Sequence, residues 1–183
     1  MSDSATRLTI TTVALHWILA LAIIGMLAVG LVLDDMAEGT ERDLLLGLHK
    51  ATGVLILAVA TLRFLYRMHS GFPVPAANAT ITEQHAKLAR MTHWLLLLGT
   101  LIMPLSGLVG TLAAGYPVDV FGLFVIPGNV VPDDNLSSLA FLVHGLFANL
   151  LMVAILLHIG GALKHHFKDK DATLTRMFGK RVT

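Results

Sequence analysis

Four long apolar stretches alternate with polar segments along the chain, and each is long enough to form a helix that crosses a bilayer. They cover residues 13–33, 44–66, 91–113 and 139–163. A membrane-spanning helix needs about 20 mostly apolar residues. Pro104 lies inside the third stretch, which a membrane helix tolerates because neighbouring groups bond to the freed carbonyl. The pattern predicts an all-α, integral membrane four-helix bundle that forms a single domain over residues 1–183.

The composition supports a membrane protein and excludes several kinds of cofactor. Hydrophobic residues make up 55% of the chain, charged residues only 14%, and the mean hydropathy is +0.75; soluble proteins carry about 25% charged residues. Cysteine is absent, which excludes disulfides, thiolate-bound zinc and cysteine-ligated iron–sulfur clusters. The net charge of +1 gives no reason to expect a nucleic-acid partner. The first apolar run is too long for a cleaved signal peptide, so we expect a retained helix.

The distribution of Lys and Arg predicts the orientation of the bundle. The N-terminal tail, the connection 67–90 and the C-terminal tail hold ten of these residues, namely Arg7, Arg67, Lys87, Arg90, Lys164, Lys168, Lys170, Arg176, Lys180 and Arg181. The two other connections hold Arg42 and eight acids, namely Asp34, Asp35, Glu38, Glu41, Asp43, Asp119, Asp133 and Asp134. Because short cytoplasmic loops are rich in Lys and Arg, we expect up-down-up-down topology with both termini cytoplasmic.

Histidines inside the apolar stretches fall at two matched depths. His144 and His158 are fourteen residues apart, which is about 40° short of four helical turns and places both on one face, ~21 Å apart. In the predicted topology His16 lies at the cytoplasmic depth of His158, and His49 lies at the outer depth of His144. The sequence therefore predicts two pairs, His16–His158 and His49–His144.

Paired imidazoles within a membrane are typical of axial ligands to haem iron. Histidine on both sides of the iron favours electron transfer over oxygen binding, and the lack of cysteine predicts two haem b groups without covalent attachment. Frequent glycines in the apolar stretches would leave room for a porphyrin face. The competing explanation is that such residues are close-packing glycines and hydrogen-bonded or proton-relaying histidines. A small transporter with a histidine proton relay is therefore a further hypothesis.

Several segments of the chain resemble the bacterial cytochrome b561 family. They read RLTITTVALHW, LHKATGVLILAVATLRFLYR, MPLSGLVG, VFGLFVIP and VHGLFANLLMVAILLHIGGALKHHFKDKDATLTRM. This four-helix di-haem family includes superoxide oxidase and is related to the cytochrome b subunits of nickel hydrogenases. The resemblance implies one haem ligand from each of the first two helices and two from the fourth, which are His16, His49, His144 and His158.

The resemblance also implies a function in the bacterial inner membrane. It implies electron transfer between the periplasmic face and ubiquinone by a multi-pass protein in the lipid bilayer. The specific enzyme hypothesis is superoxide:ubiquinone oxidoreductase. The alternative is a non-enzymatic electron carrier or membrane anchor subunit that is fed by a periplasmic redox protein, so whether the chain is an enzyme stays open.

Four further residues are candidates for supporting roles. Arg63 lies fourteen residues after His49, so it is expected to bind a propionate of the cytoplasmic-side haem or to extend to the lipid headgroups. Lys50 is expected to pair with a propionate of the outer haem, with Asp43 or with headgroups. His165 follows His158 by seven residues and shares nearly the same face.

His165 is a candidate hydrogen-bond partner for a quinone at the cytoplasmic side, and a solvated residue of the basic tail is the alternative. His93 opens the third stretch at cytoplasmic depth. It has no depth-matched partner in this scheme, so we expect it to lie near the quinone or to support a ligand rather than to bind iron. The eight acids of the outer connections, opposed by Arg42 and Lys50, predict a face that repels superoxide and suits a cationic donor protein.

Overall fold

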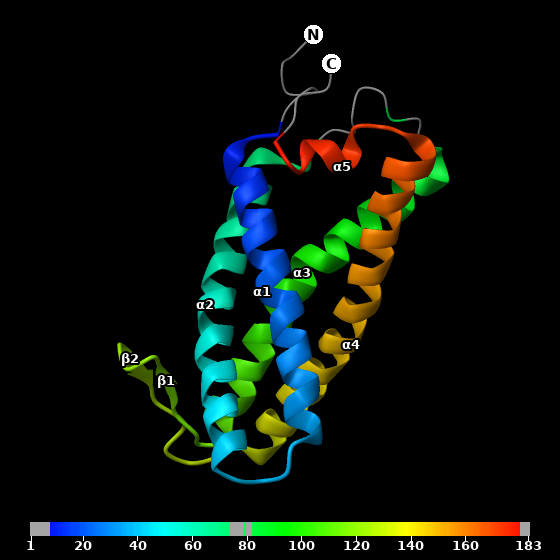
Figure 1. The fold of residues 1–183 in the computed structure, drawn as a ribbon. Coiled ribbons are helices and arrows are strands. Elements are labelled where there is room, and N and C mark those ends of the chain that lie inside the picture. Colours follow the sequence, from blue (N-terminus) through cyan, green and yellow to red (C-terminus); the bar gives the residue numbers. More distant parts are fainter. Residues whose placement is uncertain (1–7, 74–78, 80–81, 180–183) are drawn as a thin grey trace.

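Four long helices run alternately down and up in the view of Figure 1, which shows the computed structural model; the structure describes residues 8–73, 79 and 82–179. They are α1 (Ile10–Asp35), α2 (Thr40–Ser70), α3 (Glu83–Ala113) and α4 (Asp134–Lys164). All four are long and apolar enough to cross a membrane. The predicted four-helix membrane bundle is confirmed. Arg7, Lys180 and Arg181, which contributed to the predicted orientation, lie outside the described residues.

Each helix extends beyond the apolar stretch that predicted it, and polar side chains cap the N-termini of α1, α3 and α4. Asp133 Oδ1 accepts a hydrogen bond from the backbone N–H of Leu136 at 2.9 Å, and Thr9 Oγ1 accepts one from Thr12 at 3.2 Å. Such caps satisfy N–H groups that have no partner within the helix. The predicted connection 67–90 is too long at both ends, since α2 continues to Ser70 and α3 begins at Glu83.

The two ends of the bundle carry different small elements. At the end where α1 finishes and α4 begins, here called the hairpin end, β1 (Val118–Val120) pairs antiparallel with β2 (Phe124–Ile126). Val118 and Val120 are buried, and β1 packs against α2. At the opposite end, here called the tail end, α4 passes into the π-helix η2 (His165–Asp169) and the short helix α5 (Thr173–Arg176). The sequence predicted none of these elements.

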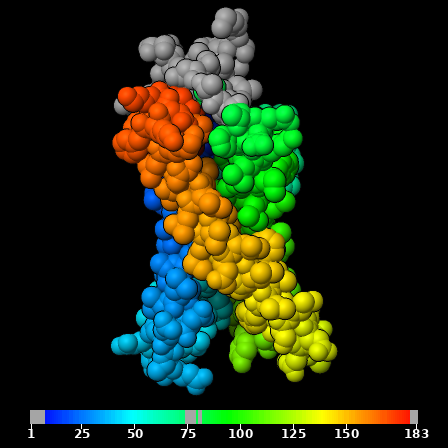
Figure 2. All heavy atoms as spheres, turned by 90° about the vertical axis from the view of Figure 1, so that its right-hand side faces the viewer, coloured from blue at the N-terminus to red at the C-terminus, as the bar shows by residue number. Residues whose placement is uncertain are grey.

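The helices do not pack evenly around the bundle. α4 packs along α3, and α2 packs against both α1 and α3, whereas within the described residues α4 makes no extended backbone contact with α1 or α2. In the space-filling view α4 crosses the molecule obliquely, beside the first turns of α3 at the tail end and away from α1 at the hairpin end (Figure 2). The two predicted histidine pairs join α4 to these more distant helices.

A belt of apolar side chains fills the middle of the bundle. Its buried members are Leu19, Ile23, Ile56, Ala60, Met103 and Leu151. Leu151 is 0% exposed and lies seven residues from both His144 and His158 along α4. The belt therefore separates the two depths at which the histidines gather.

Candidate functional site

The structure brings the four predicted histidines together as two pairs at opposite ends of the bundle. At the hairpin end the ring centroids of His49 on α2 and His144 on α4 lie 6.3 Å apart. At the tail end the ring centroids of His16 on α1 and His158 on α4 lie 6.0 Å apart. These are the two pairs that matching by depth predicts.

The spacing of both pairs fits a metal ion held between the rings. An imidazole nitrogen binds a metal ion at about 2 Å and the ring centre lies about 1 Å farther back, so two imidazoles on opposite sides of one ion have centroids roughly 6 Å apart. Both observed separations, 6.3 Å and 6.0 Å, agree with that value. Each pair also joins α4 to a helix with which it makes no extended backbone contact within the described residues.

His144 is held in one tautomer by the backbone of α3. Its Nδ1 lies 2.7 Å from the carbonyl oxygen of Met103. A carbonyl only accepts, so Nδ1 carries the proton, and the lone pair of Nε2 remains for a ligand. Ser106 Oγ donates to the same carbonyl at 2.9 Å. Met103 and Ser106 lie on either side of Pro104 in α3.

Gly107 makes this position of His144 sterically feasible. A Cβ atom built on Gly107 would lie 2.7 Å from Nδ1 and 2.8 Å from Cε1 of His144, closer than non-bonded atoms approach. The glycines of α3 were predicted to clear a porphyrin, but Gly107 instead accommodates the ring of His144. Gly99 and Gly110 likewise lie against α4 side chains, those of Leu151 and Phe141.

His49 presents a polar atom that no side chain or backbone group satisfies. Its Nδ1 is buried and has no hydrogen-bond partner among the described residues. A buried polar nitrogen without a partner is costly, so a bound metal or another ligand group would relieve it. Gly30 of α1 lies beside this ring, with its built Cβ 3.8 Å from Cε1 of His49.

At the tail end the pair of His16 and His158 is part of a larger group. His93 on α3 lies with its ring centroid 5.3 Å from that of His158, and it stacks on Phe72 at 6.3 Å. The expectation that His93 has no partner is wrong, because α3 packs along α4 and places His93 beside His158. Three imidazoles therefore meet here, although the separation of His16 and His158 fits linear coordination better.

Arg63 lies inside the bundle beside this group. Its Nη2 is 3.4 Å from Nδ1 of His16, which is a long contact. A guanidinium has donors only, so Nδ1 accepts in this arrangement. Of the two predicted positions for Arg63, the structure has the one facing the tail-end histidines. Arg67 is also turned inward: it is buried, and its Nη1 donates to the carbonyl of Gly71 at 2.8 Å.

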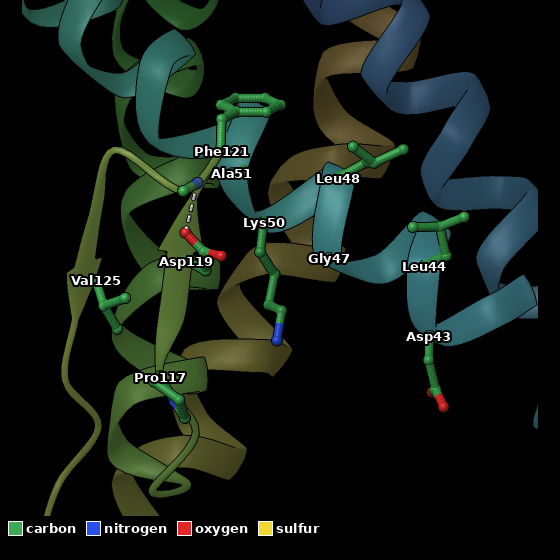
Figure 3. Close-up of a pocket in the computed structure, with 11 residues that line it drawn as sticks. Asp43, Leu44, Gly47, Leu48, Lys50, Ala51, Pro117, Asp119, Phe121 and Val125 are labelled. Carbon is green, nitrogen blue, oxygen red and sulfur yellow. Dashed lines mark hydrogen bonds between the residues drawn. The ribbon is translucent and has the colours of Figure 1, made fainter. Parts of the chain in front are cut away.

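Lys50 lines a pocket of about 490 Å³ between the start of α2 and the β-hairpin. Figure 3 shows Lys50 between Asp43 of α2 and Asp119 of β1. Asp119 Oδ1 accepts from the backbone N–H of Gly122 at 2.8 Å. No described residue forms an ion pair with Lys50, so the predicted pairing with Asp43 is absent. Phe121 and Val125 give the pocket an apolar wall.

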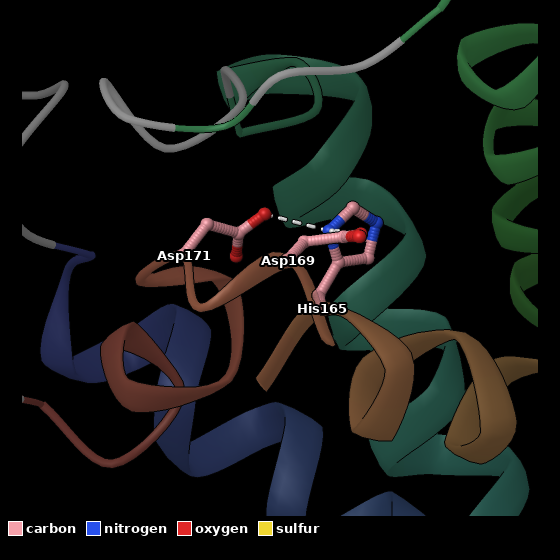
Figure 4. A group of neighbouring side chains, drawn as sticks. All are labelled: His165, Asp169 and Asp171. Carbon is pink, nitrogen blue, oxygen red and sulfur yellow. Dashed lines mark hydrogen bonds and ion pairs between the residues drawn. The ribbon is translucent and has the colours of Figure 1, made fainter. Parts of the chain in front are cut away.

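His165 lies beyond His158 at the tail end, in a cluster of charged groups. Its Nδ1 is 2.6 Å from Asp171 Oδ2 and 3.3 Å from Asp169 Oδ2 (Figure 4). The side chain of His165 is 21% exposed and that of Asp171 only 1%. The sequence suggested His165 as a site residue because it shares a helix face with His158. It did not suggest the carboxylates, because Asp171 reaches the ring only through η2 and the turn that follows.

Membrane-spanning helices that hold pairs of imidazoles at the spacing of metal ligands are typical of one class of protein, the membrane-spanning haem proteins. The profile of the prokaryotic cytochrome b561 family matches residues 7–180, and this chain belongs to that family. It is therefore a bacterial membrane haem protein of electron transport, and membership implies that it binds haem b.

Relatives in the same family resemble the chain over nearly its whole length. It is 32% identical over 181 residues to "Cytochrome b561 homolog 2" of Escherichia coli (strain K12), covering 98% of this chain and 95% of that protein. It is 28% identical over 178 residues to "Cytochrome b561 homolog 1" of the same organism, covering 96% and 98%. It is 27% identical over 169 residues to "Probable superoxide oxidase CybB" of Yersinia pestis, covering 92% and 94%.

Proposed function

We propose that the chain carries electrons through the bacterial inner membrane between a periplasmic donor and ubiquinone, using two haem b groups. One observation supports this proposal: two imidazole pairs lie at opposite ends of the bundle, with centroid separations of 6.3 Å and 6.0 Å. Fourteen residues separate His144 from His158, which corresponds to ~21 Å along the helix. One centre lies near each membrane surface, and the apolar belt lies between them.

His49 and His144 would hold the haem at the hairpin end, and His16 and His158 would hold the haem at the tail end. Haem iron with two histidine ligands takes up and releases one electron without binding oxygen. The residues of this chain orient the ligands: the carbonyl of Met103 accepts a hydrogen bond from Nδ1 of His144, so Nε2 would be free to bind the iron. Leu151 and its neighbours in the belt exclude water between the two sites.

Arg63 would bind a propionate of the tail-end haem. If His16 binds iron through Nε2, its Nδ1 carries a proton and no longer accepts from Arg63. The guanidinium then needs another acceptor within the bundle, and a carboxylate binds it in a bidentate manner. The 3.4 Å contact with His16 supports this reading because it places Arg63 at the tail-end centre. On the outer side, Lys50 remains the propionate candidate, although it lines the external pocket.

The tail end would face the cytoplasm and the hairpin end the periplasm. This orientation follows from the cations of the tails and the 67–90 connection and from the eight acids of the other connections. The quinone would bind at the tail end, where His165 and His93 lie near the His16–His158 pair.

The donor that the charges favour is a cationic periplasmic redox protein. Acidic residues dominate the proposed periplasmic face, and an acidic surface steers a basic partner to it. In this case the chain is an electron carrier or an anchor subunit rather than an enzyme by itself.

Superoxide is the second candidate donor. The support is the name of the Yersinia pestis relative, "Probable superoxide oxidase CybB", and the position of Lys50 at the outer pocket. Asp43 and Asp119 line the same pocket, so its formal charge is −1 and it gives an anion little attraction. We therefore expect superoxide to react slowly.

Quinone reduction by the purified, haem-loaded protein tests the proposal. The protein is reduced under anaerobic conditions and mixed with a short-chain ubiquinone, and the oxidation of haem b is followed by its absorption. We expect rapid oxidation that slows strongly in His165→Ala while the haem spectrum stays intact. Oxidation no faster than that of free haem b in detergent would contradict a quinone reductase.

A further inference from the structure

Two carboxylates, those of Asp169 and Asp171, lie near the same ring nitrogen of His165, just after the end of α4. Asp171 Oδ2 accepts from Nδ1 of His165 at 2.6 Å. Asp169 Oδ2 lies 3.3 Å from the same nitrogen but is 2.6 Å from Lys164 Nζ. The nearest partner of Nδ1 is therefore Asp171, whereas Asp169 pairs mainly with Lys164.

The ligand atoms of His165, Asp169 and Asp171 lie within 4.8 Å of one another, a spacing that also occurs in metal sites. Here the groups already satisfy each other: Lys164 neutralises Asp169, and the proton of His165 bonds to Asp171. A divalent cation would have to displace both interactions. The cluster is better described as an oriented histidine than as a cation site.

Asp171 itself is held by the segment that follows it. Its Oδ1 accepts from the backbone N–H of Thr173 at 2.8 Å, and its side chain is 1% exposed. Burial acts to raise the pKa of Asp171, but the hydrogen bonds from Thr173 and His165 outweigh it and lower the pKa. The carboxylate is therefore ionised at neutral pH.

The segment around α5 is in turn attached to the first helix. Trp17 Nε1 donates to the carbonyl oxygen of Met177 at 2.7 Å, and the rings of Trp17 and Phe178 lie 5.2 Å apart. Trp17 is next to His16 in the sequence. The carboxylate of Asp171 thus has a fixed position relative to the tail-end histidines.

We propose that Asp171 is the positioning residue for proton delivery to the quinone: it keeps the proton of neutral His165 on Nδ1 and stabilises the doubly protonated ring, so that Nε2 faces the quinone oxygen. This proposal rests on the proposed function, because it assumes a quinone at the tail end. The ring nitrogen Nε2 points away from the two carboxylates (Figure 4).

The chemistry balances with the donor already proposed. Reduction of a quinone to a quinol takes two electrons, which reach the tail end from the donor, and two protons. His165 gives one proton from Nε2 to a quinone oxygen, an O–H bond forms as the N–H bond breaks, and the ring takes a new proton from cytoplasmic water. The second proton comes from water. Asp171 stays ionised throughout and touches neither the quinone nor its protons.

The substitution Asp171→Asn tests the positioning role because of how the side chain is held. The N–H of Thr173 donates to one oxygen of residue 171, so the carboxamide keeps its oxygen there and turns its NH₂ toward His165. Nδ1 must then accept, and the proton moves to Nε2. A wrong tautomer of this kind impairs proton transfer even where the fold is intact.

Two measurements on the full-length, reduced haem protein read this out. ¹⁵N NMR with labelled histidine should show the His165 proton on Nδ1 in the wild type and on Nε2 in Asp171→Asn. Stopped-flow oxidation by ubiquinone-1 should fall about tenfold at pH 8 in the variant.

Asp169→Asn is the matched control, because it removes a carboxylate of the same cluster that pairs mainly with Lys164. We expect the His165 proton to stay on Nδ1 and the rate to change less than about twofold. Among the described residues, the other charged group of this cluster is Lys164, which pairs with Asp169. Lys164 is retained in all three proteins, so it does not affect the comparison.

The outcomes separate this proposal from the proposed function. If His165→Ala leaves the oxidation rate unchanged, the quinone does not bind at His165 and the proposed site is wrong. If His165→Ala is slow but Asp171→Asn keeps the wild-type rate and tautomer, then Asp171 has only a structural role and the positioning proposal is overturned. Equal effects of Asp169→Asn and Asp171→Asn would overturn it as well.

Discussion

Gly107→Ala should remove the haem at the hairpin end while leaving the other in place. The substitution adds one methyl group to α3, opposite the ring of His144. That methyl carbon would lie 2.7 Å from Nδ1 of His144. On one side are the backbone of α3 and the carbonyl of Met103, so the ring itself has to move.

The required displacement is larger than a metal site tolerates. Non-bonded heavy atoms come into ordinary contact near 3.5 Å, so the ring must retreat by about 0.8 Å. Functional geometry has to be held to within about 0.5 Å. A movement of that size also bends or breaks the 2.7 Å hydrogen bond from Nδ1 to Met103. Loss of such a partner lowers the affinity of a ligating histidine for metal by about 10–100-fold.

The haem content of purified protein measures the effect, by the pyridine haemochrome method. We expect about two haems per chain in the wild type and about one in Gly107→Ala. Gly25→Ala is the control, since a Cβ at Gly25 meets no atom within 4 Å and position 25 lies opposite His16 around α1. Two haems per chain and an unchanged spectrum in Gly107→Ala would refute the argument that this glycine accommodates the ligand.

Two further predictions concern charge at the two ends. Arg63→Leu should lower the midpoint potential of the tail-end haem by roughly 50 mV, because a nearby cation favours the reduced state. A redox titration measures this potential, and an unchanged value would mean that Arg63 does not interact with that haem. Reduction by a superoxide pulse should be slow and should become faster as salt screens the acidic hairpin end, which stopped-flow absorption measures. A near-diffusion-limited rate that falls with salt and collapses in Lys50→Ala would instead show that Lys50 outweighs the acids and that superoxide is the donor.

The four-helix bundle and the pairing of its histidines could be predicted because both depend on periodicity. Apolar length defines a membrane span, and helical geometry places residues fourteen apart on one face. His144 and His158 therefore indicated two histidine sites at different depths in the membrane. The alternating direction of the helices then matched His144 with His49 and His158 with His16. The same arithmetic placed Arg63 at the depth of His16.

The sequence could not predict contacts that depend on how far a helix continues or how it is rotated. His93 lies beside His158 because α3 packs along α4. The contact between Gly107 and His144 depends on the packing of α4 against the turn containing Pro104. Asp171 meets His165 only because the chain turns back after η2, where Lys170 has a left-handed backbone conformation with φ of 53°. Polar sequence in a basic tail gives no sign of that turn.

The most direct test of two separate haem centres compares His144→Ala with His158→Ala. Haem content and the optical spectrum of each purified variant should be measured beside the wild type. We expect about two haems per chain in the wild type and about one in each variant, with the haem lost from opposite ends, so that the two remaining haems differ in midpoint potential. One haem per chain in the wild type, or loss of all haem in both variants, would contradict it.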